Sequence, residues 1–123
     1  MSALAGKRIL VMEDEFLISA MLCDMLSESE ATVIGPAARI DVALQLIENH
    51  GLDAAILDMS LNGQWIDPVA EALHRRGTPF VFTTSYGTNS LSQKFGARTL
   101  EKPFLWEAVE MQLSLAILDQ SHA

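Results

Sequence analysis

Five apolar runs that alternate with segments of helical periodicity constrain this chain more than any other feature of its sequence. The runs cover residues 7–12, 31–34, 54–57, 79–83 and 97–101, and the helical segments cover residues 15–28, 40–50, 68–76, 89–95 and 104–119. Strands that alternate with helices form parallel sheets with helices on both faces. The run 54–57 is apolar without alternation, which is typical of a strand that is covered on both sides.

Glycine and proline residues mark several of the expected ends. Gly35 and Pro36 are expected to end the second strand, because this pair interrupts regular structure. Gly51 is expected to follow the second helix, while Pro68 and Gly77 are expected near the start and just past the end of the third. For so short a chain, we predict an α/β fold with a doubly wound five-stranded parallel sheet of order 2-1-3-4-5, which is flavodoxin-like.

The acidic composition limits the partners that the chain can bind. Sixteen Asp and Glu residues against eight Lys and Arg residues give a net charge of −8, which disfavours nucleic acid and anionic membrane surfaces. The single cysteine, Cys23, allows no internal disulfide and fits a reducing compartment. No apolar stretch approaches the ~20 residues that span a bilayer, and residues 1–6 lack the basic part of a secretory signal. We therefore expect one cytoplasmic domain over residues 1–123.

Residues with reactive or ligating side chains follow four of the predicted strands. Glu13 and Asp14 come directly after the first strand, and Asp58 follows the third. Thr84 follows the fourth strand and Lys102 the fifth. Because the carboxyl ends of parallel strands meet at one edge of the sheet, we expect these side chains to converge there. Open α/β sheets place their ligand sites at that edge, where the strand order reverses.

The three carboxylates predict a metal site. Carboxylates brought close together repel one another unless a cation lies among them. Oxygen ligands favour Mg²⁺, which takes a few carboxylates and keeps several waters. We therefore predict that Glu13, Asp14 and Asp58 hold one Mg²⁺, with a backbone carbonyl near Ser60 as a further ligand.

The remaining residues predict phosphoryl chemistry at Asp58. A carboxylate can attack phosphorus and form an acyl phosphate. The transferred group spreads its charge over three equatorial oxygens. We expect the Lys102 ammonium and the Thr84 hydroxyl to contact two of these oxygens, and the metal to contact the third.

Each of these residues also has a purely structural interpretation. Asp14 could cap the following helix, Asp58 could be a turn residue, Thr84 could be an ordinary strand residue and Lys102 a solvated lysine. Glu15 is expected in the first helical turn, where an acid complements the helix dipole, and is not counted as a ligand. The ordered combination at successive strand ends favours a site over four separate explanations.

This ordered set resembles the receiver domain of bacterial two-component response regulators over essentially the whole chain. The resemblance rests on Glu13-Asp14, Asp58, Thr84 and Lys102-Pro103-Phe104. It implies that Asp58 accepts a phosphoryl group from a sensor histidine kinase and that Glu13 and Asp14 bind Mg²⁺. It further implies that Thr84 and Lys102 contact the phosphoryl group and report its presence.

Two positions depart from the receiver pattern. Glu13 replaces an aspartate, and the longer side chain could bind the metal through a water. Thr99 lies three positions before Lys102, where the family usually has an aromatic residue that takes part in switching. The sequence leaves open whether Tyr86 or Thr99 takes over that role.

The segment 79–87 resembles in part the motif of the FATGUY subfamily of receivers. Thr83 and Ser85 replace the alanine and glycine of that motif, and Tyr86 comes one place early. The subfamily resemblance implies a kinase of the HWE or related class as partner. It also implies that the signal passes through rearrangement of residues 84–95.

The expected action is that of a stand-alone receiver without an output domain. Such a chain would act by protein–protein contact or by draining phosphoryl groups from a kinase, and would have no enzymatic turnover beyond its own phosphorylation and slow dephosphorylation. The fourth helix, fifth strand and fifth helix are the candidate readout surface. The many apolar residues of segment 104–119 are attributed to core burial, with a partner surface as the alternative.

Three other functions are weighed against this one. The four retained site residues count against a receiver-like module that binds partners without phosphorylation, while the departures at Glu13 and Thr99 leave this alternative open. A phosphohydrolase of the haloacid dehalogenase type needs a second aspartate two residues after the nucleophile, where this chain has Ser60. A flavodoxin-like cofactor carrier needs a first loop that cradles phosphate, and the acids Glu13, Asp14 and Glu15 would repel it.

Overall fold

The sheet of this protein has five parallel strands, as the sequence predicts. The structure is a computed structural model and describes residues 3–59, 61, 66–84 and 94–121. The strands are β1 (Arg8–Met12), β2 (Thr32–Ala37), β3 (Ala54–Asp58), β4 (Phe80–Thr84) and β5 (Arg98–Glu101). Their order in the sheet is β2-β1-β3-β4-β5, and every neighbouring pair is parallel. The predicted flavodoxin-like α/β fold is therefore confirmed.

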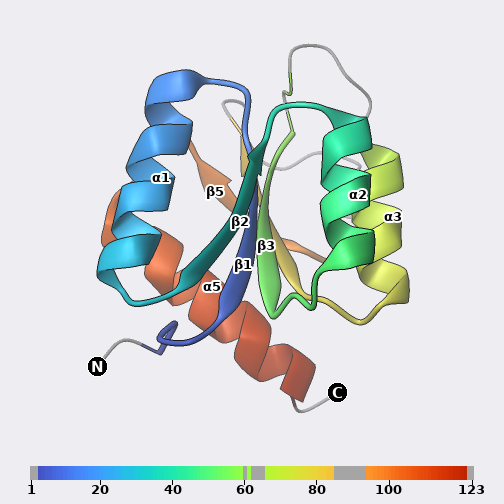
Figure 1. The fold of residues 1–123 in the computed structure, drawn as a ribbon. Coiled ribbons are helices and arrows are strands. Elements are labelled where there is room, and N and C mark those ends of the chain that lie inside the picture. Colours follow the sequence, from blue (N-terminus) through green and yellow to red (C-terminus); the bar gives the residue numbers. More distant parts are fainter. Residues whose placement is uncertain (1–2, 60, 62–65, 85–93, 122–123) are drawn as a thin grey trace.

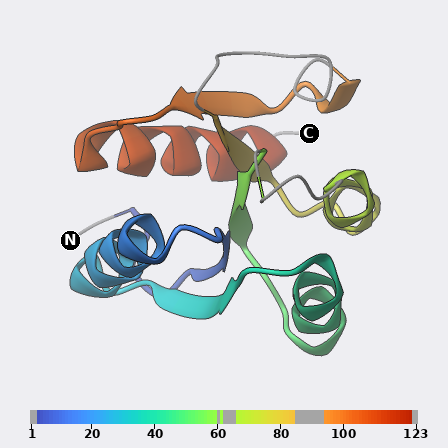
Figure 2. The ribbon, with the colours of Figure 1, turned by 90° about the horizontal axis from the view of Figure 1, so that it is seen from above.

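Helices cover both faces of the sheet. They are α1 (Phe16–Glu28), α2 (Ile40–Asn49), α3 (Asp67–Arg75) and α5 (Trp106–Ser121). Helices α1 and α5 lie on one face, and α2 and α3 lie on the other (Figure 1). Figure 2 shows the same three layers from above. The helix predicted over residues 89–95 lies almost entirely outside the described residues. None of the described helices has the length and apolar character needed to cross a bilayer.

Strand β3 separates two hydrophobic cores. Its residues Ala55 and Leu57 pack in the core beneath α2 and α3, while Ala54 and Ile56 pack in the core beneath α1 and α5. All five residues of β3 are buried. Because both faces of the strand are covered, its sequence shows an unbroken apolar run instead of alternation.

Core burial explains only one side of α5. Val109, Leu113 and Ala116 are buried against the sheet, but Met111 is 60 % exposed and Leu118 is 51 % exposed. Residues 111 and 118 are two helical turns apart and lie on the side of α5 that faces away from the core. The expectation that burial accounts for the apolar residues of segment 104–119 is therefore wrong for these two, and also for Leu105, which is 73 % exposed just before α5.

Strand β2 does not end at Gly35 and Pro36, contrary to expectation. It continues to Ala37, and its pairing with β1 shifts register between Leu10 and Met12. The strand lies at the edge of the sheet, where a bulge or a proline without an N–H is tolerated. Gly35 has a φ of +108°, a backbone conformation that residues with a side chain rarely adopt.

A comparison of two glycines tests the importance of this bulge. A Cβ at Gly35 would lie 3.0 Å from the Val11 carbonyl oxygen, whereas a Cβ at Gly51 would meet no atom within 4 Å. We expect Gly35→Ala to lower the free energy of unfolding by about 1–3 kcal/mol, because it adds a clash to an unfavourable φ. Gly51→Ala should change it by less than about 0.5 kcal/mol. Urea unfolding followed by circular dichroism measures the stability of both variants. Equal unfolding midpoints would contradict the structural importance of the bulge at Gly35.

Candidate functional site

Backbone hydrogen bonds hold the predicted site residues at the carboxyl edge of the sheet. The Glu13 N–H donates to the Ala37 carbonyl over 3.0 Å, and the Lys102 N–H donates to the Thr84 carbonyl over 2.7 Å. Both bonds extend the strand ladder one residue beyond β1 and β5. The register pairs Asp58 with a residue of β4, so the ends of the central strands lie level.

The structure brings the three predicted carboxylates together. Glu13, Asp14 and Asp58 each offer an oxygen within 4.8 Å of the others. Asp58 is 1 % exposed and Glu13 is 3 % exposed, whereas Asp14 is half-buried. Buried acids at such spacing repel one another, so the arrangement requires a cation or bound protons.

Lys102 supplies positive charge within this cluster. Its Nζ lies 3.1 Å from Glu13 Oε1 and 3.3 Å from Asp58 Oδ2. It also lies 3.4 Å from Glu15 Oε1. The Lys102 side chain is only 8 % exposed, so the interpretation of this residue as a solvated lysine is wrong. The ammonium is held in a buried ion-pair network.

The electrostatics of the cluster shift the pKa of Glu13 strongly. Burial is the largest cause, and the neighbouring Asp58 adds to it through a hydrogen bond and its charge. The Glu15 backbone N–H and Lys102 act in the opposite direction. The net effect raises the pKa of Glu13 from 4.5 to about 7. Near neutral pH, Glu13 therefore carries a proton in a sizeable share of the metal-free molecules.

Two more groups of the cluster have shifted pKa values. Partial burial and the nearby Asp58 charge raise the pKa of Asp14. Burial of the Lys102 ammonium disfavours its charge, but the carboxylates of Asp58 and Glu13 outweigh this and raise the pKa of Lys102. Lys102 is consequently charged throughout the neutral range.

The acids after β1 do not have the helix roles considered for them from the sequence. Helix α1 begins at Phe16, and Glu15 occupies its N-cap without a side-chain capping hydrogen bond. Asp14 therefore does not cap the helix. Glu15 was expected within the first turn of the helix, but it lies one residue before that turn. The contact between Glu15 and Lys102 was missed from the sequence, because the two residues are far apart along the chain.

The remaining predicted residues lie beside the cluster or outside the described part of the chain. Thr84 is 2 % exposed at the end of β4. Thr99 pairs with Phe82 in the register of β4 and β5, and its buried hydroxyl has no hydrogen-bond partner among the described residues. Ser60, the predicted source of a carbonyl ligand, and Tyr86 both lie outside the described residues.

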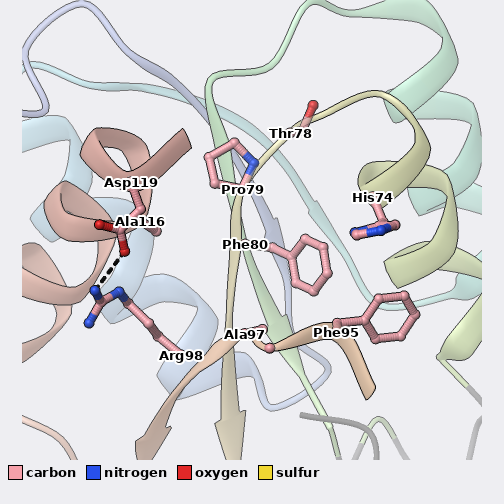
Figure 3. A pocket seen from close by; sticks show the side chains of 10 residues that line it. His74, Thr78, Pro79, Phe80, Phe95, Ala97, Arg98, Ala116 and Asp119 are labelled. Carbon is pink, nitrogen blue, oxygen red and sulfur yellow. Dashed lines mark hydrogen bonds and ion pairs between the residues drawn. The ribbon is translucent and has the colours of Figure 1, made fainter. Parts of the chain in front are cut away.

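A separate cavity lies at the opposite, amino-terminal edge of the sheet. Its volume is about 220 Å³, and it lies between the end of α3 and the starts of β4 and β5 (Figure 3). The Phe95 ring contacts the Phe80 and His74 rings edge to face on one wall, and Arg98 pairs with Asp119 over 2.7 Å on the other. The residues that line this cavity do not include Glu13, Asp14 or Asp58.

The donor set of the acid cluster fits a divalent cation. All three groups are carboxylates, and hard cations prefer oxygen ligands. Within the described part of the chain, the buried Glu13 Oε1 accepts no well-aligned hydrogen bond, and its neighbour is the Lys102 ammonium 3.1 Å away. The residues after β1 and β3 thus form a candidate metal site, with Lys102 at its rim.

Fold and site together define a receiver-type α/β protein, and comparisons with known proteins extend this result. The chain is 41 % identical to SdrG from Sphingomonas melonis Fr1, with a TM-score of 0.79 over 96 % of this chain and 99 % of that one. It is 26 % identical to the REC domain of the response regulator PhyR from Erythrobacter litoralis, with a TM-score of 0.80 over 95 % of this chain and 94 % of that one. No family model matches the sequence.

A curated relative matches over part of its length. The chain is 32 % identical to the transcriptional regulatory protein PdtaR of Mycobacterium tuberculosis in an alignment of 121 positions, which covers 91 % of this chain and 59 % of that protein. The chain thus spans about three fifths of this relative. The protein belongs to the response regulator receiver family of two-component signalling.

The raised pKa of Glu13 predicts how stability depends on pH without metal. The folded protein binds a proton at Glu13 that the unfolded chain releases near pH 4.5, so the free energy of unfolding should fall as pH rises from about 5 to about 7. Glu13→Gln should make this slope shallower, because it removes the titrating group. Urea unfolding at a series of pH values in the presence of a chelator measures both slopes. Parallel curves for the two proteins would show that Glu13 is not the group that causes this pH dependence.

Proposed function

We propose that Asp58 accepts a phosphoryl group from a sensor histidine kinase and that its phosphorylation switches a protein-interaction surface or drains phosphoryl groups from the kinase. The observation that carries this proposal is the position of the Lys102 ammonium, 3.3 Å from the buried Asp58 carboxylate. A buried nucleophile beside a fixed cation suits attack on an anionic group.

The proposed cofactor is Mg²⁺, held by the carboxylates of Glu13, Asp14 and Asp58. When bound, the ion would offset the negative charge of these acids and of the phosphoryl oxygens. The carboxylates of Glu13 and its two acidic neighbours would supply the oxygen ligands. A carbonyl of Ser60, which lies outside the described residues, remains part of the proposal.

The chain's own residues have defined parts in the transfer. The bond between phosphorus and the donor imidazole nitrogen breaks as a bond forms between phosphorus and an Asp58 carboxylate oxygen. The electron pair of the broken bond stays on the imidazole. Lys102 would contact one phosphoryl oxygen through its ammonium, and the Thr84 hydroxyl would contact another. The Lys102 N–H already donates to the Thr84 carbonyl, so movement of either residue would affect the other.

The proposed partners are proteins. Exposed Met111 and Leu118 on α5, beside β5, are suited to a readout surface for a downstream protein. The partial likeness of segment 79–87 to the FATGUY motif favours a kinase of the HWE or related class. The net charge of −8 disfavours nucleic acid and anionic membranes. The single Cys23 suits the reducing cytoplasm, which is the proposed location.

A receiver-like module that works without phosphorylation is the second candidate. It is favoured by Glu13, which is partly protonated near neutral pH and would bind metal less readily than an ionised aspartate. It is also favoured by Thr99, which replaces the aromatic residue of the usual switch. A metal-binding measurement separates this candidate from the first.

Removal of the acceptor carboxylate tests the proposed function. Wild-type protein should bind beryllofluoride, a phosphoryl mimic, only when Mg²⁺ is present, with amide shifts around Glu13, Thr84 and Lys102. Asp58→Asn should abolish this response while the fold is kept, because the attacking oxygen is lost. Asp24→Asn, which neutralises an exposed acid of α1, is the matched control and should respond like wild type. Absence of any response to Mg²⁺ and beryllofluoride in wild type would favour the second candidate.

A further inference from the structure

Glu15 contacts the site lysine but is not part of the carboxylate cluster. Its Oε1 lies 3.4 Å from Lys102 Nζ, and its side chain is 60 % exposed. Glu13 and Asp58 also pair with Lys102, but their side chains are only 1 % exposed and belong to the candidate metal site. Among the acids that pair with this lysine in the described part of the chain, Glu15 is the one outside the metal-binding group.

The usual structural role of an acid at this position does not account for Glu15. An acid at a helix N-cap commonly accepts a hydrogen bond from the first turn. Glu15 occupies the N-cap of α1, but its side chain makes no capping hydrogen bond. The local hydrogen bonds of Glu15 are made by its backbone instead. Its N–H donates to Glu13 Oε2 over 3.1 Å, and its carbonyl accepts from the Ser19 N–H. The carboxylate is thereby left to the contact with Lys102.

We propose that Glu15 is a positioning residue that holds the Lys102 ammonium at the rim of the site and competes with the phosphoryl group for it. The inference rests on the proposed function. When Glu13 and Asp58 serve as metal ligands, their oxygens are less available to the lysine. Glu15 is then the acid that retains Lys102, and the incoming phosphoryl group must draw the ammonium away from it.

This role predicts different effects on the binding of beryllofluoride and of Mg²⁺. Glu15→Gln keeps the size of the side chain and removes its charge, so the phosphoryl mimic no longer competes for Lys102. Beryllofluoride at saturating Mg²⁺ should bind about two- to fivefold more tightly, which is the range expected for loss of one exposed ion pair. Binding of Mg²⁺ alone should be no tighter, because loss of a negative charge cannot strengthen binding of a cation.

A second acid at the same end of the molecule serves as the control. Glu107 is exposed in the first turn of α5, so Glu107→Gln makes the same change in charge and size. It should leave beryllofluoride binding as in wild type. In the metal-free protein, the Nζ resonance of Lys102 should shift in Glu15→Gln and stay in place in Glu107→Gln.

The decisive experiment is a titration of all three proteins with Mg²⁺ and then with beryllofluoride, followed by NMR. Tighter beryllofluoride binding and a shifted Lys102 resonance in Glu15→Gln alone are the expected results. Equal behaviour of the two variants would overturn the role of Glu15 and leave the proposed function intact. Failure of the wild-type chain to bind beryllofluoride with Mg²⁺ would overturn both.

Discussion

The pairing of one buried ammonium with buried carboxylates is the interaction on which the site depends. Lys102 Nζ lies within 3.3 Å of both Glu13 and Asp58, whose side chains are almost fully buried. Removing one partner of a buried ion pair leaves an uncompensated charge, which is strongly destabilising. The lysine thus allows acids to gather at the sheet edge, and the hydrogen bond of its N–H to Thr84 fixes its backbone there.

Most of the fold could be predicted from the sequence, because the physical signals are local. The unbroken apolar run that becomes β3 reflects burial on both faces, and the alternation of strands with helices leaves few possible topologies. The convergence of Glu13, Asp14 and Asp58 follows from the topology, since the ends of parallel strands share one edge.

The features that sequence reasoning missed depend on contacts between distant segments. Gly35 and Pro36 interrupt most strands, but pairing with β1 at the sheet edge keeps them within β2. Met111 and Leu118 are apolar residues of the kind found in cores. Their exposure depends on which side of α5 faces the sheet. The link between Glu15 and Lys102 required the geometry of both strand ends.

The raised pKa of Glu13 means that the charge of the acid cluster depends on pH and on bound metal. With no metal bound, a proton on Glu13 relieves the repulsion that burial and Asp58 impose. A divalent ion needs the deprotonated carboxylate, so metal and proton compete for the same group. The longer side chain of glutamate at this position reaches Lys102, so a bound ion would share the Glu13 carboxylate with the lysine. The burial that makes the metal-free cluster unfavourable is therefore also what would make a bound cation effective there.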